Sequence, residues 1–173
     1  VRDRTALERV RDLVLREYGA PAVLVNNAGI DFVPEPGVRE NDAVFQQTVD
    51  VNLVGVYNTT EVFGGPMCDA GHGSIVNIGS LYAAVAPDPA FYDHFDPPFV
   101  KPSAYGASKA AQIALAASWQ AETQRIGPRV VIATPHGMPT TTRARFFPGE
   151  DRSRLASPRD EAARILREML PNA

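Results

Sequence analysis

A tyrosine and a lysine four residues apart form the most chemically suggestive pair in this chain. Tyr105 and Lys109 lie in the run Tyr-Gly-Ala-Ser-Lys, and residues at this spacing share one face of a helix. A free tyrosine titrates at roughly pH 10 and is a poor base at neutral pH, but a neighbouring lysine cation stabilises the phenolate and lowers the pKa of the phenol. The pair therefore predicts an acid/base tyrosine, although taken alone it is more typical of an exposed helix face.

Two further polar residues are expected close to this pair. Ser80 follows a short apolar run, and Asn52 lies inside a long segment with helical spacing. In an open sheet of parallel strands, ligands bind in the crevice outside the carboxyl ends of the strands. We therefore expect both side chains beside Tyr105 and Lys109, although a strand-end turn would explain Ser80 alone and a hydrogen bond at a helix kink would explain Asn52 alone.

Helices and strands alternate along the chain in an order that would place these residues. Apolar residues recur at helical spacing in some segments and form short uninterrupted runs in others, with turn residues between them. Ser103 is a suitable N-cap for the helix that carries Tyr105. The first strand reads as buried on both faces. The expected helices cover residues 5–18, 41–63, 103–124 and 158–169, and the expected strands cover residues 22–25, 73–78 and 129–134.

This alternation predicts an α/β fold with an open, doubly wound parallel sheet, of which three strands are recognisable. The chain has 173 residues, of which 45% are apolar, and this suffices for one domain with a sizeable core but not for two ordinary ones. Ligand binding is expected at the turns that follow the three strands, at residues 26–29, 79–82 and 135–142.

Four motifs resemble those of the short-chain dehydrogenases/reductases and follow one another in that family's order. They are the Asn-Asn-Ala-Gly turn at residues 26–29, Asn52 within Val-Asn-Leu-Val-Gly, Ser80 at a strand end, and Tyr105 with Lys109. The resemblance implies a Rossmann-like domain that binds NAD or NADP. It also implies hydride transfer between that cofactor and a small-molecule carbonyl compound or secondary alcohol.

The resemblance also assigns a role to each residue of the catalytic set. Tyr105 would donate or accept the substrate proton, and Lys109 would lower the pKa of that tyrosine and hold the nicotinamide ribose. Ser80 would hydrogen-bond the substrate oxygen. Asn52 would link Lys109 to solvent through a water molecule.

Cofactor-binding residues follow from the same resemblance, and Tyr105 and Lys109 belong to them as well as to the catalytic set. Asn27, Ala28 and Gly29 resemble the turn that passes the adenosine ribose, where small residues let the backbone approach a ligand closely. Pro135 and Thr140 resemble the segment that holds the nicotinamide carboxamide. A histidine follows Pro135 where the family usually has glycine, and the next two threonines offer other registers for Thr140.

The chain departs from the family pattern at both ends. A complete domain of this family opens with a strand, a glycine-rich turn and a helix whose N-terminus receives the pyrophosphate. No such segment precedes the helix at residues 5–18, and the family's last strand is not recognisable after Leu170. We therefore expect residues 1–173 to form a single partial domain that lacks the first β-α-β unit. The strand before Asn26 would then lie at an open edge of the sheet. The residue that distinguishes NAD from NADP would be missing as well.

Composition narrows the classes of function. The formal net charge is −3 with both signs interspersed, so no basic stripe exists for a phosphate backbone, and nucleic acid is not an expected partner. No apolar run approaches the roughly 20 residues of a membrane helix. The single cysteine can form no internal disulfide, and three scattered histidines predict no metal site. These features favour a cytoplasmic protein.

Two other functions fit parts of the sequence. A catalytically silent fragment that acts only in binding or assembly would explain the missing glycine-rich turn. Sugar-nucleotide epimerases share a tyrosine and a lysine at this spacing, but the Asn-Asn-Ala-Gly turn argues against them. The complete set of Asn52, Ser80, Tyr105 and Lys109 favours the oxidoreductase.

Residues 86–102 lengthen the connection between Ser80 and Tyr105 and are rich in proline and aromatic residues. The aromatic side chains of Tyr92, Phe95 and Phe99 could form a wall of the substrate pocket. They could equally pack together in a surface loop.

The two long helices are expected to carry a subunit interface. In the family, similar helices pair across a two-fold axis, so a homodimer or homotetramer is expected. Their apolar side chains exceed what one sheet face is expected to cover, and those residues are Phe45, Val49, Val56, Phe63, Leu115 and Trp119.

The missing glycine-rich turn generates a first prediction. The chain of 173 residues should bind NAD(H) and NADP(H) weakly or not at all, because it lacks the backbone N–H groups that would receive the pyrophosphate. Fluorescence titration measures this directly. Micromolar affinity for either dinucleotide would contradict the prediction.

Overall fold

Three parallel strands form the centre of the structure, a computed structural model that describes residues 1–32, 38–125 and 127–169. The strands are β1 (Val23–Asn26), β2 (Ser74–Ile78) and β3 (Arg129–Ala133), in the order β1-β2-β3. Short apolar runs rich in valine and isoleucine suit strands of this kind. The sheet confirms the predicted α/β class and the Rossmann-like topology.

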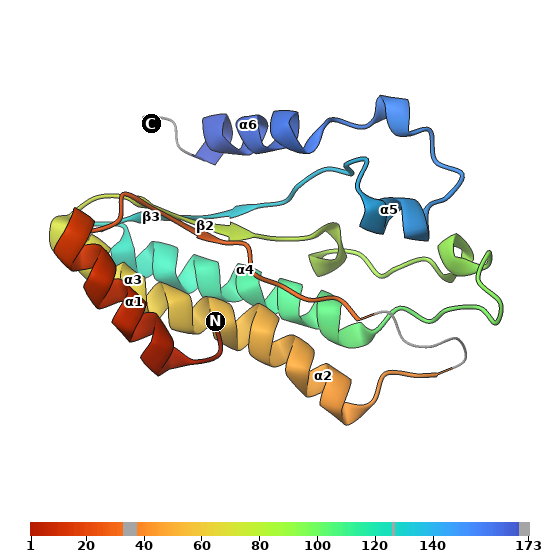
Figure 1. Cartoon of the computed structure of the whole chain (residues 1–173), viewed down its shortest axis with the longest axis horizontal. Helices are drawn as coiled ribbons and strands as arrows, with labels where there is room; N and C mark the ends of the chain where they lie inside the picture. Colours follow the sequence, from red (N-terminus) through yellow and green to blue (C-terminus); the bar gives the residue numbers. More distant parts are fainter. Residues whose placement is uncertain (33–37, 126, 170–173) are drawn as a thin grey trace.

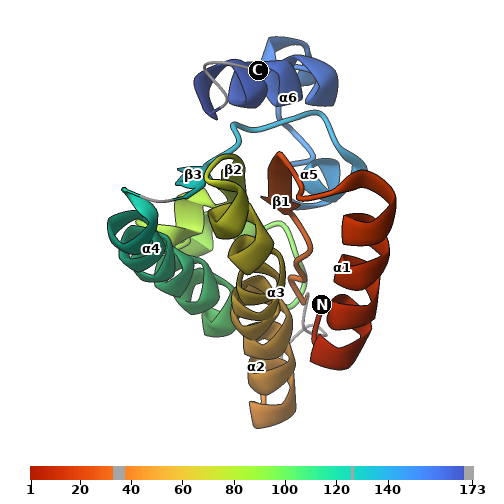
Figure 2. The same ribbon diagram turned by 90° about the vertical axis from the view of Figure 1, so that its left-hand side faces the viewer.

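Helices lie on both faces of the sheet (Figures 1 and 2). α1, α3 and α4 cover one face, and α6 lies over the other. The loops that leave the carboxyl ends of the strands gather at one end of the molecule, together with α5 (Figure 1). The helices are α1 (Arg4–Tyr18), α2 (Asp42–Val49), α3 (Gly55–Ala70), α4 (Ser103–Thr123), α5 (Thr141–Phe146) and α6 (Pro158–Met169).

A single long helix runs from α2 into α3, and it is longer than predicted. A π-helical segment, Asp50–Val54, joins the two parts. The sequence predicted an end near Phe63, before two glycines and Pro66, but the helix continues to Ala70. Met67, which follows the proline, is fully buried, and this burial offsets the cost of a proline inside the helix. Gly71, with φ 73°, ends the helix in the left-handed conformation.

The main core lies between the sheet and the helices α3 and α4. Its buried members are Val56, Met67, Ile75, Ala116, Trp119 and Val130. Three residues expected to supply surplus apolar surface for a subunit interface are instead buried inside the chain, because they pack on or beside the strands. These are Val56, Phe63 and Trp119.

β1 is buried on one face only, so the prediction of burial on both faces was wrong. Asn26 is buried against α3, where its amide donates to Thr60 Oγ1 at 3.0 Å. Val23 and Val25 point the opposite way and are 40% and 50% exposed. No described helix covers that face of β1, and within the described residues β1 pairs with β2 alone.

The aromatic loop packs against α5 in a second, smaller core. Tyr92, Phe99 and Phe146 are its buried members, with Phe95 and Phe147 packed around them. The rings of Tyr92 and Phe99 meet edge to face, with centroids 5.2 Å apart, an arrangement that aromatic pairs favour. The loop therefore packs partly on itself and partly on Phe146 of α5 and Phe147, which follows α5.

The N-terminus of α4 is capped by a side chain from another segment. Ser103 was predicted as the N-cap, but the helix starts at Ser103 and Pro102 precedes it. Glu40 fills the role instead: its carboxylate accepts from the N–H of Ser103 at 3.0 Å, from the Ser103 hydroxyl at 2.7 Å and from the N–H of Ala104 at 3.2 Å. A carboxylate at this helix end also interacts favourably with the helix dipole.

Two expectations concern the chain as a whole. Among the helices in the described ranges, none is long and apolar enough to span a membrane. The expected absence of a strand after Leu170 concerns residues outside the described ranges.

Candidate active site

A cleft of about 870 Å³ lies at the carboxyl ends of the three strands. We call it the main cleft. Ser80, Tyr105 and Lys109 all line it, although Ser80 follows β2 and the other two lie on α4. Asn27, Gly29 and Pro135 are the other sequence-predicted residues in its lining. The parallel arrangement of the strands brings these residues together, as expected of such sheets.

The phenol of Tyr105 remains protonated over a wide pH range. Burial of the ring raises the pKa of Tyr105, and the negative charge of Asp31 acts in the same direction. A hydrogen bond with Ser80 lowers this pKa but does not overcome the burial. The sequence had suggested a lowered value, through the ammonium of Lys109. The Lys109 Nζ lies 5.9 Å from the centroid of the Tyr105 ring, and desolvation outweighs it.

Lys109 is almost fully buried, at 5% exposure. Its Nζ donates to the carbonyl oxygen of Ile78 at 2.7 Å, which holds the ammonium at the end of β2. Burial lowers the pKa of Lys109. An ammonium has three N–H donors, so two remain for other acceptors after the bond to Ile78. A group with paired hydroxyls, such as the nicotinamide ribose, fits this donor set.

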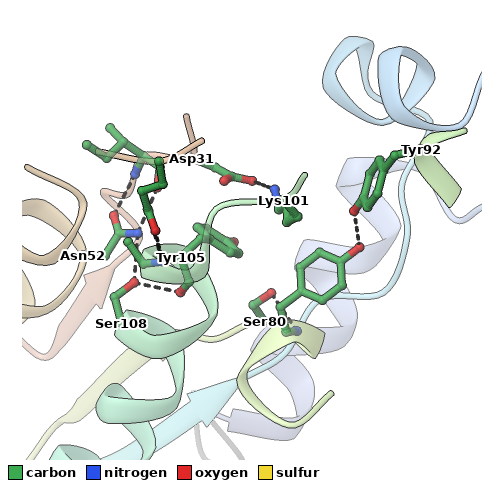
Figure 3. A network of polar contacts seen from close by, with 11 residues as sticks. Asp31, Asn52, Ser80, Tyr92, Lys101, Tyr105 and Ser108 are labelled. Carbon is green, nitrogen blue, oxygen red and sulfur yellow. Dashed lines mark hydrogen bonds and ion pairs between the residues drawn. The ribbon is translucent and has the colours of Figure 1, made fainter. Parts of the chain in front are cut away.

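Asn52 lies behind the cleft and is fully buried. Its Oδ1 accepts from the N–H of Ile30 at 2.7 Å, and its Nδ2 donates to the carbonyl oxygen of Ile30 at 2.9 Å and to Ser108 Oγ at 3.2 Å (Figure 3). Asn52 also sits in the π-helical segment. The side chain therefore ties the turn after β1 to α4, and both of its N–H donors are used. A water link from Asn52 to Lys109 stays a prediction.

The turn after β1 leaves little room for a side chain at Gly29. A Cβ added at Gly29 would lie 3.3 Å from Asn52 Oδ1 and 3.8 Å from Lys109 Nζ. Glycine therefore keeps open the space in front of the lysine ammonium. Asn27 and Gly29 line the main cleft, whereas Ala28 is exposed and absent from its lining. The structure thus places two of the three predicted turn residues at the cleft.

The loop after β3 carries the remaining predicted residues. Pro135 lines the main cleft, and Thr140 lines a neighbouring hollow of about 250 Å³ that also contacts Ser80 and Tyr105. We call it the side hollow. Thr140 is the N-cap of α5, where its Oγ1 accepts from the N–H of Arg143 at 3.2 Å. The sequence did not predict α5, which has six residues and lacks a clear apolar period.

A buried carboxylate from α6 holds this loop in place. Glu161 Oε1 accepts from the backbone N–H of His136 at 2.8 Å, and Arg164 lies against the same carboxylate, with Nη2 2.5 Å from Oε1. The ring of His136 is 69% exposed, with its Nδ1 3.3 Å from Glu161 Oε2. The hydrogen bonds from Arg164 and His136 lower the pKa of Glu161 to about 2.

The sequence did not predict an ion pair that lies beside Tyr105. Lys101 and Asp31 form an ion pair, as Figure 3 shows, and both line the side hollow. The Lys101 Nζ lies 5.1 Å from the centroid of the Tyr105 ring. Lys101 stands four residues before Tyr105, as Lys109 stands four residues after it. Lys101 precedes α4, so this spacing is not a helical one, and no local pattern points from Lys101 to Asp31.

Comparison with known proteins places the chain among dehydrogenases and reductases. A family model described as short chain dehydrogenase matches residues 1–151. Galactitol 2-dehydrogenase of Rhizobium johnstonii is 36% identical over 122 residues, which are 70% of this chain and 44% of that protein. Sulfoacetaldehyde reductase 2 of Chromohalobacter salexigens is 32% identical over 142 residues, which are 82% of this chain and 51% of that protein.

Solved structures show the same similarity in three dimensions. A gluconate 5-dehydrogenase from Burkholderia cenocepacia, in complex with NADP and tartrate, is 26% identical with a TM-score of 0.69 over 87% of this chain and 53% of its own. A short chain dehydrogenase from Salmonella enterica has the same fold, with a TM-score of 0.79 at 23% identity over 96% of this chain and 64% of its own. The chain spans between a third and a half of the length of the first curated relatives that it matches.

The carboxylate of Glu161 generates a prediction for pH-dependent stability. Its pKa is about 2 in the folded chain against an ordinary value of 4.5, so it stabilises the fold above pH 4.5. That contribution should be lost as the pH falls from 4.5 towards 2. Urea unfolding of Glu161→Gln should give a lower free energy of unfolding than wild type at pH 7. As the pH falls from 4.5 towards 2, this free energy should decrease less than it does in wild type. Glu17→Gln, at an exposed position on α1, is the matched control and should behave as wild type. An unchanged acidic slope in Glu161→Gln would contradict this assignment.

Proposed function

Because the chain belongs to the short-chain dehydrogenase family, we propose that it carries the catalytic part of an oxidoreductase. The substrate is a carbonyl compound in one direction and a secondary alcohol in the other. The observation that supports this most directly is the meeting of Ser80, Tyr105 and Lys109 at one cleft, although Ser80 and Tyr105 are 25 residues apart in sequence.

The nicotinamide cofactor, when bound, would supply a hydride in its reduced form, NADH or NADPH, for reduction and accept one in its oxidised form, NAD⁺ or NADP⁺, for oxidation. Asn27 and Gly29 would lie along its adenosine ribose, and the residues that would hold its nicotinamide half are Lys109, Pro135 and Thr140. The donors on Lys109 and the open space at Gly29 fit a ribose, as described above. The similar gluconate 5-dehydrogenase was solved with NADP.

In the direction of reduction, two hydroxyls act on the carbonyl oxygen of the substrate. The Ser80 hydroxyl hydrogen-bonds this oxygen, and the Tyr105 phenol donates its proton to it as the hydride reaches the carbon. The phenol is protonated at neutral pH, as a general acid must be. The resulting phenolate is stabilised by the Lys109 ammonium, and the proton is replaced from solvent. In oxidation the same phenolate would act as the base, so oxidation should be favoured at higher pH.

Removal of one oxygen atom tests the assignment of Tyr105. In the intact enzyme, Tyr105→Phe should lower turnover by roughly 10²- to 10⁴-fold, the usual contribution of a general acid or base. Cofactor affinity should stay nearly unchanged, because the hydroxyl transfers a proton. Steady-state kinetics and fluorescence titration measure the two effects. Tyr18→Phe, at an 86% exposed tyrosine on α1, is the control. Turnover within about threefold of wild type would exclude Tyr105 as the general acid or base. If the intact wild-type enzyme binds cofactor but shows no turnover, the catalytically silent binding module is favoured instead.

We also propose that the chain forms an isologous dimer through the exposed faces of α3 and α4. An apolar groove of about 420 Å³ lies there, lined by Leu53, Val54, Tyr57, Ala114 and Leu115 among others. Val54 and Tyr57 are 41% and 42% exposed, which is unusual for apolar side chains that sit together. Of the residues predicted from the sequence to form the subunit interface, only Leu115 lines this groove.

The dimer can be tested by charge substitution in this groove. Sedimentation velocity at micromolar concentration should show a dimer or larger species for the wild type. Val54→Glu with Tyr57→Glu should shift it to monomer, because two charges would be buried in an apolar interface. Tyr18→Glu on α1, 86% exposed, should leave assembly unchanged. A folded wild-type monomer at this concentration would contradict the interface.

A further inference from the structure

Lys101 is a buried cation in an aromatic surrounding. Its side chain is 6% exposed, and its Nζ lies 5.1 Å from the ring centroids of Tyr105 and Phe146 and 5.6 Å from that of Tyr82. Rings at these distances attract a cation, but they do not neutralise it. A buried ammonium still needs an anion beside it, and Asp31 supplies one.

The charged residues that line the side hollow next to Lys101 belong to two ion pairs. The lining contains Asp31, Lys101 and Arg143. Lys101 pairs with Asp31, whereas Arg143 pairs at 2.6 Å with Glu150, which lies outside this lining. An anionic group that enters the side hollow next to Tyr105 must therefore take the place of one of these two carboxylates.

The two partners of the ion pair differ in their freedom to separate. The side chain of Asp31 is 28% exposed, against 6% for Lys101. Asp31 can turn towards water at small cost, whereas the Lys101 side chain is buried and would be left without a counter-ion. If another carboxylate takes the place of the Asp31 side chain beside Lys101, an anion enters the side hollow at a small cost in free energy.

Building on the oxidoreductase function proposed above, we propose that Lys101 determines substrate specificity by binding a carboxylate of the substrate in place of Asp31. The preferred substrates are then oxo acids and hydroxy acids. Their carboxylate lies near the reacting carbon, because Lys101 and the acid/base phenol border the same side hollow.

Matched substrates and two variants of opposite charge test this in the intact enzyme. The substrates are 2-oxobutanoate, 3-oxobutanoate and 4-oxopentanoate, each with its methyl ester. Wild type should prefer at least one acid over its ester. Lys101→Met, whose thioether suits an aromatic surrounding, should lower kcat/KM for that acid by roughly 10- to 100-fold, mainly through KM, as expected when a hydrogen bond to a charged group is lost. The ester should change by less than about threefold. Asp31→Asn removes the competing anion and should lower KM for the acid.

The two variants should change KM for the acid in opposite directions, and this distinguishes substrate recognition by Lys101 from a structural role of the ion pair. A purely structural ion pair would make Lys101→Met and Asp31→Asn impair acid and ester alike, and that result would overturn the proposal. So would a wild-type preference for the esters. If the enzyme reduces no carbonyl compound, the proposed function fails on its own. Calorimetric binding of 4-oxopentanoate then decides on Lys101: tighter binding by wild type than by Lys101→Met supports the proposal, whereas equal affinity or no binding overturns it.

Discussion

The carboxamide of Asn52 holds three segments of the chain together, and the layout of the cleft depends on it. Its oxygen accepts from the N–H of Ile30, and its nitrogen donates to the Ile30 carbonyl and to Ser108 on α4. The side chain is fully buried, so an unpaired atom here would cost about 1–3 kcal/mol. The turn after β1 is thereby fixed against the helix that carries Tyr105 and Lys109.

Carboxylates from neighbouring segments fix the remaining parts of the cleft in a similar way. Glu40 accepts from backbone N–H groups at the start of α4, and Glu161 accepts from the backbone N–H of His136 after β3. Each bond joins a charged acceptor to a main-chain donor, a stronger combination than a bond between neutral groups. The cleft is therefore held in shape by main-chain contacts before any ligand enters, which reduces the ordering cost of binding.

Much of this arrangement could be predicted from the sequence, because it depends on local patterns. Apolar runs and turn residues gave the three strands, and the rule that ligands bind at the carboxyl ends of parallel strands brought Ser80 to Tyr105. Other features depend on contacts that no local pattern encodes. Lys101 and Asp31 are 70 residues apart, and the raised pKa of Tyr105 follows from burial by its surroundings. The helix through Pro66 is held by core packing, which overrides helix propensity.

The π-helical segment Asp50–Val54 acts as one extra residue in an otherwise regular helix. Each residue turns an α-helix by about 100°, so the segment resets the phase between the residues before it and those after it. Deletion of a single residue there would restore a regular α-helix. In that regular helix, Asn52 could not point at Ile30 while Val56 and Met67 stay buried, because their relative directions would have changed. Apart from Asn52, this stretch should consequently tolerate substitution far better than a change in length, and natural length variation in relatives should fall elsewhere.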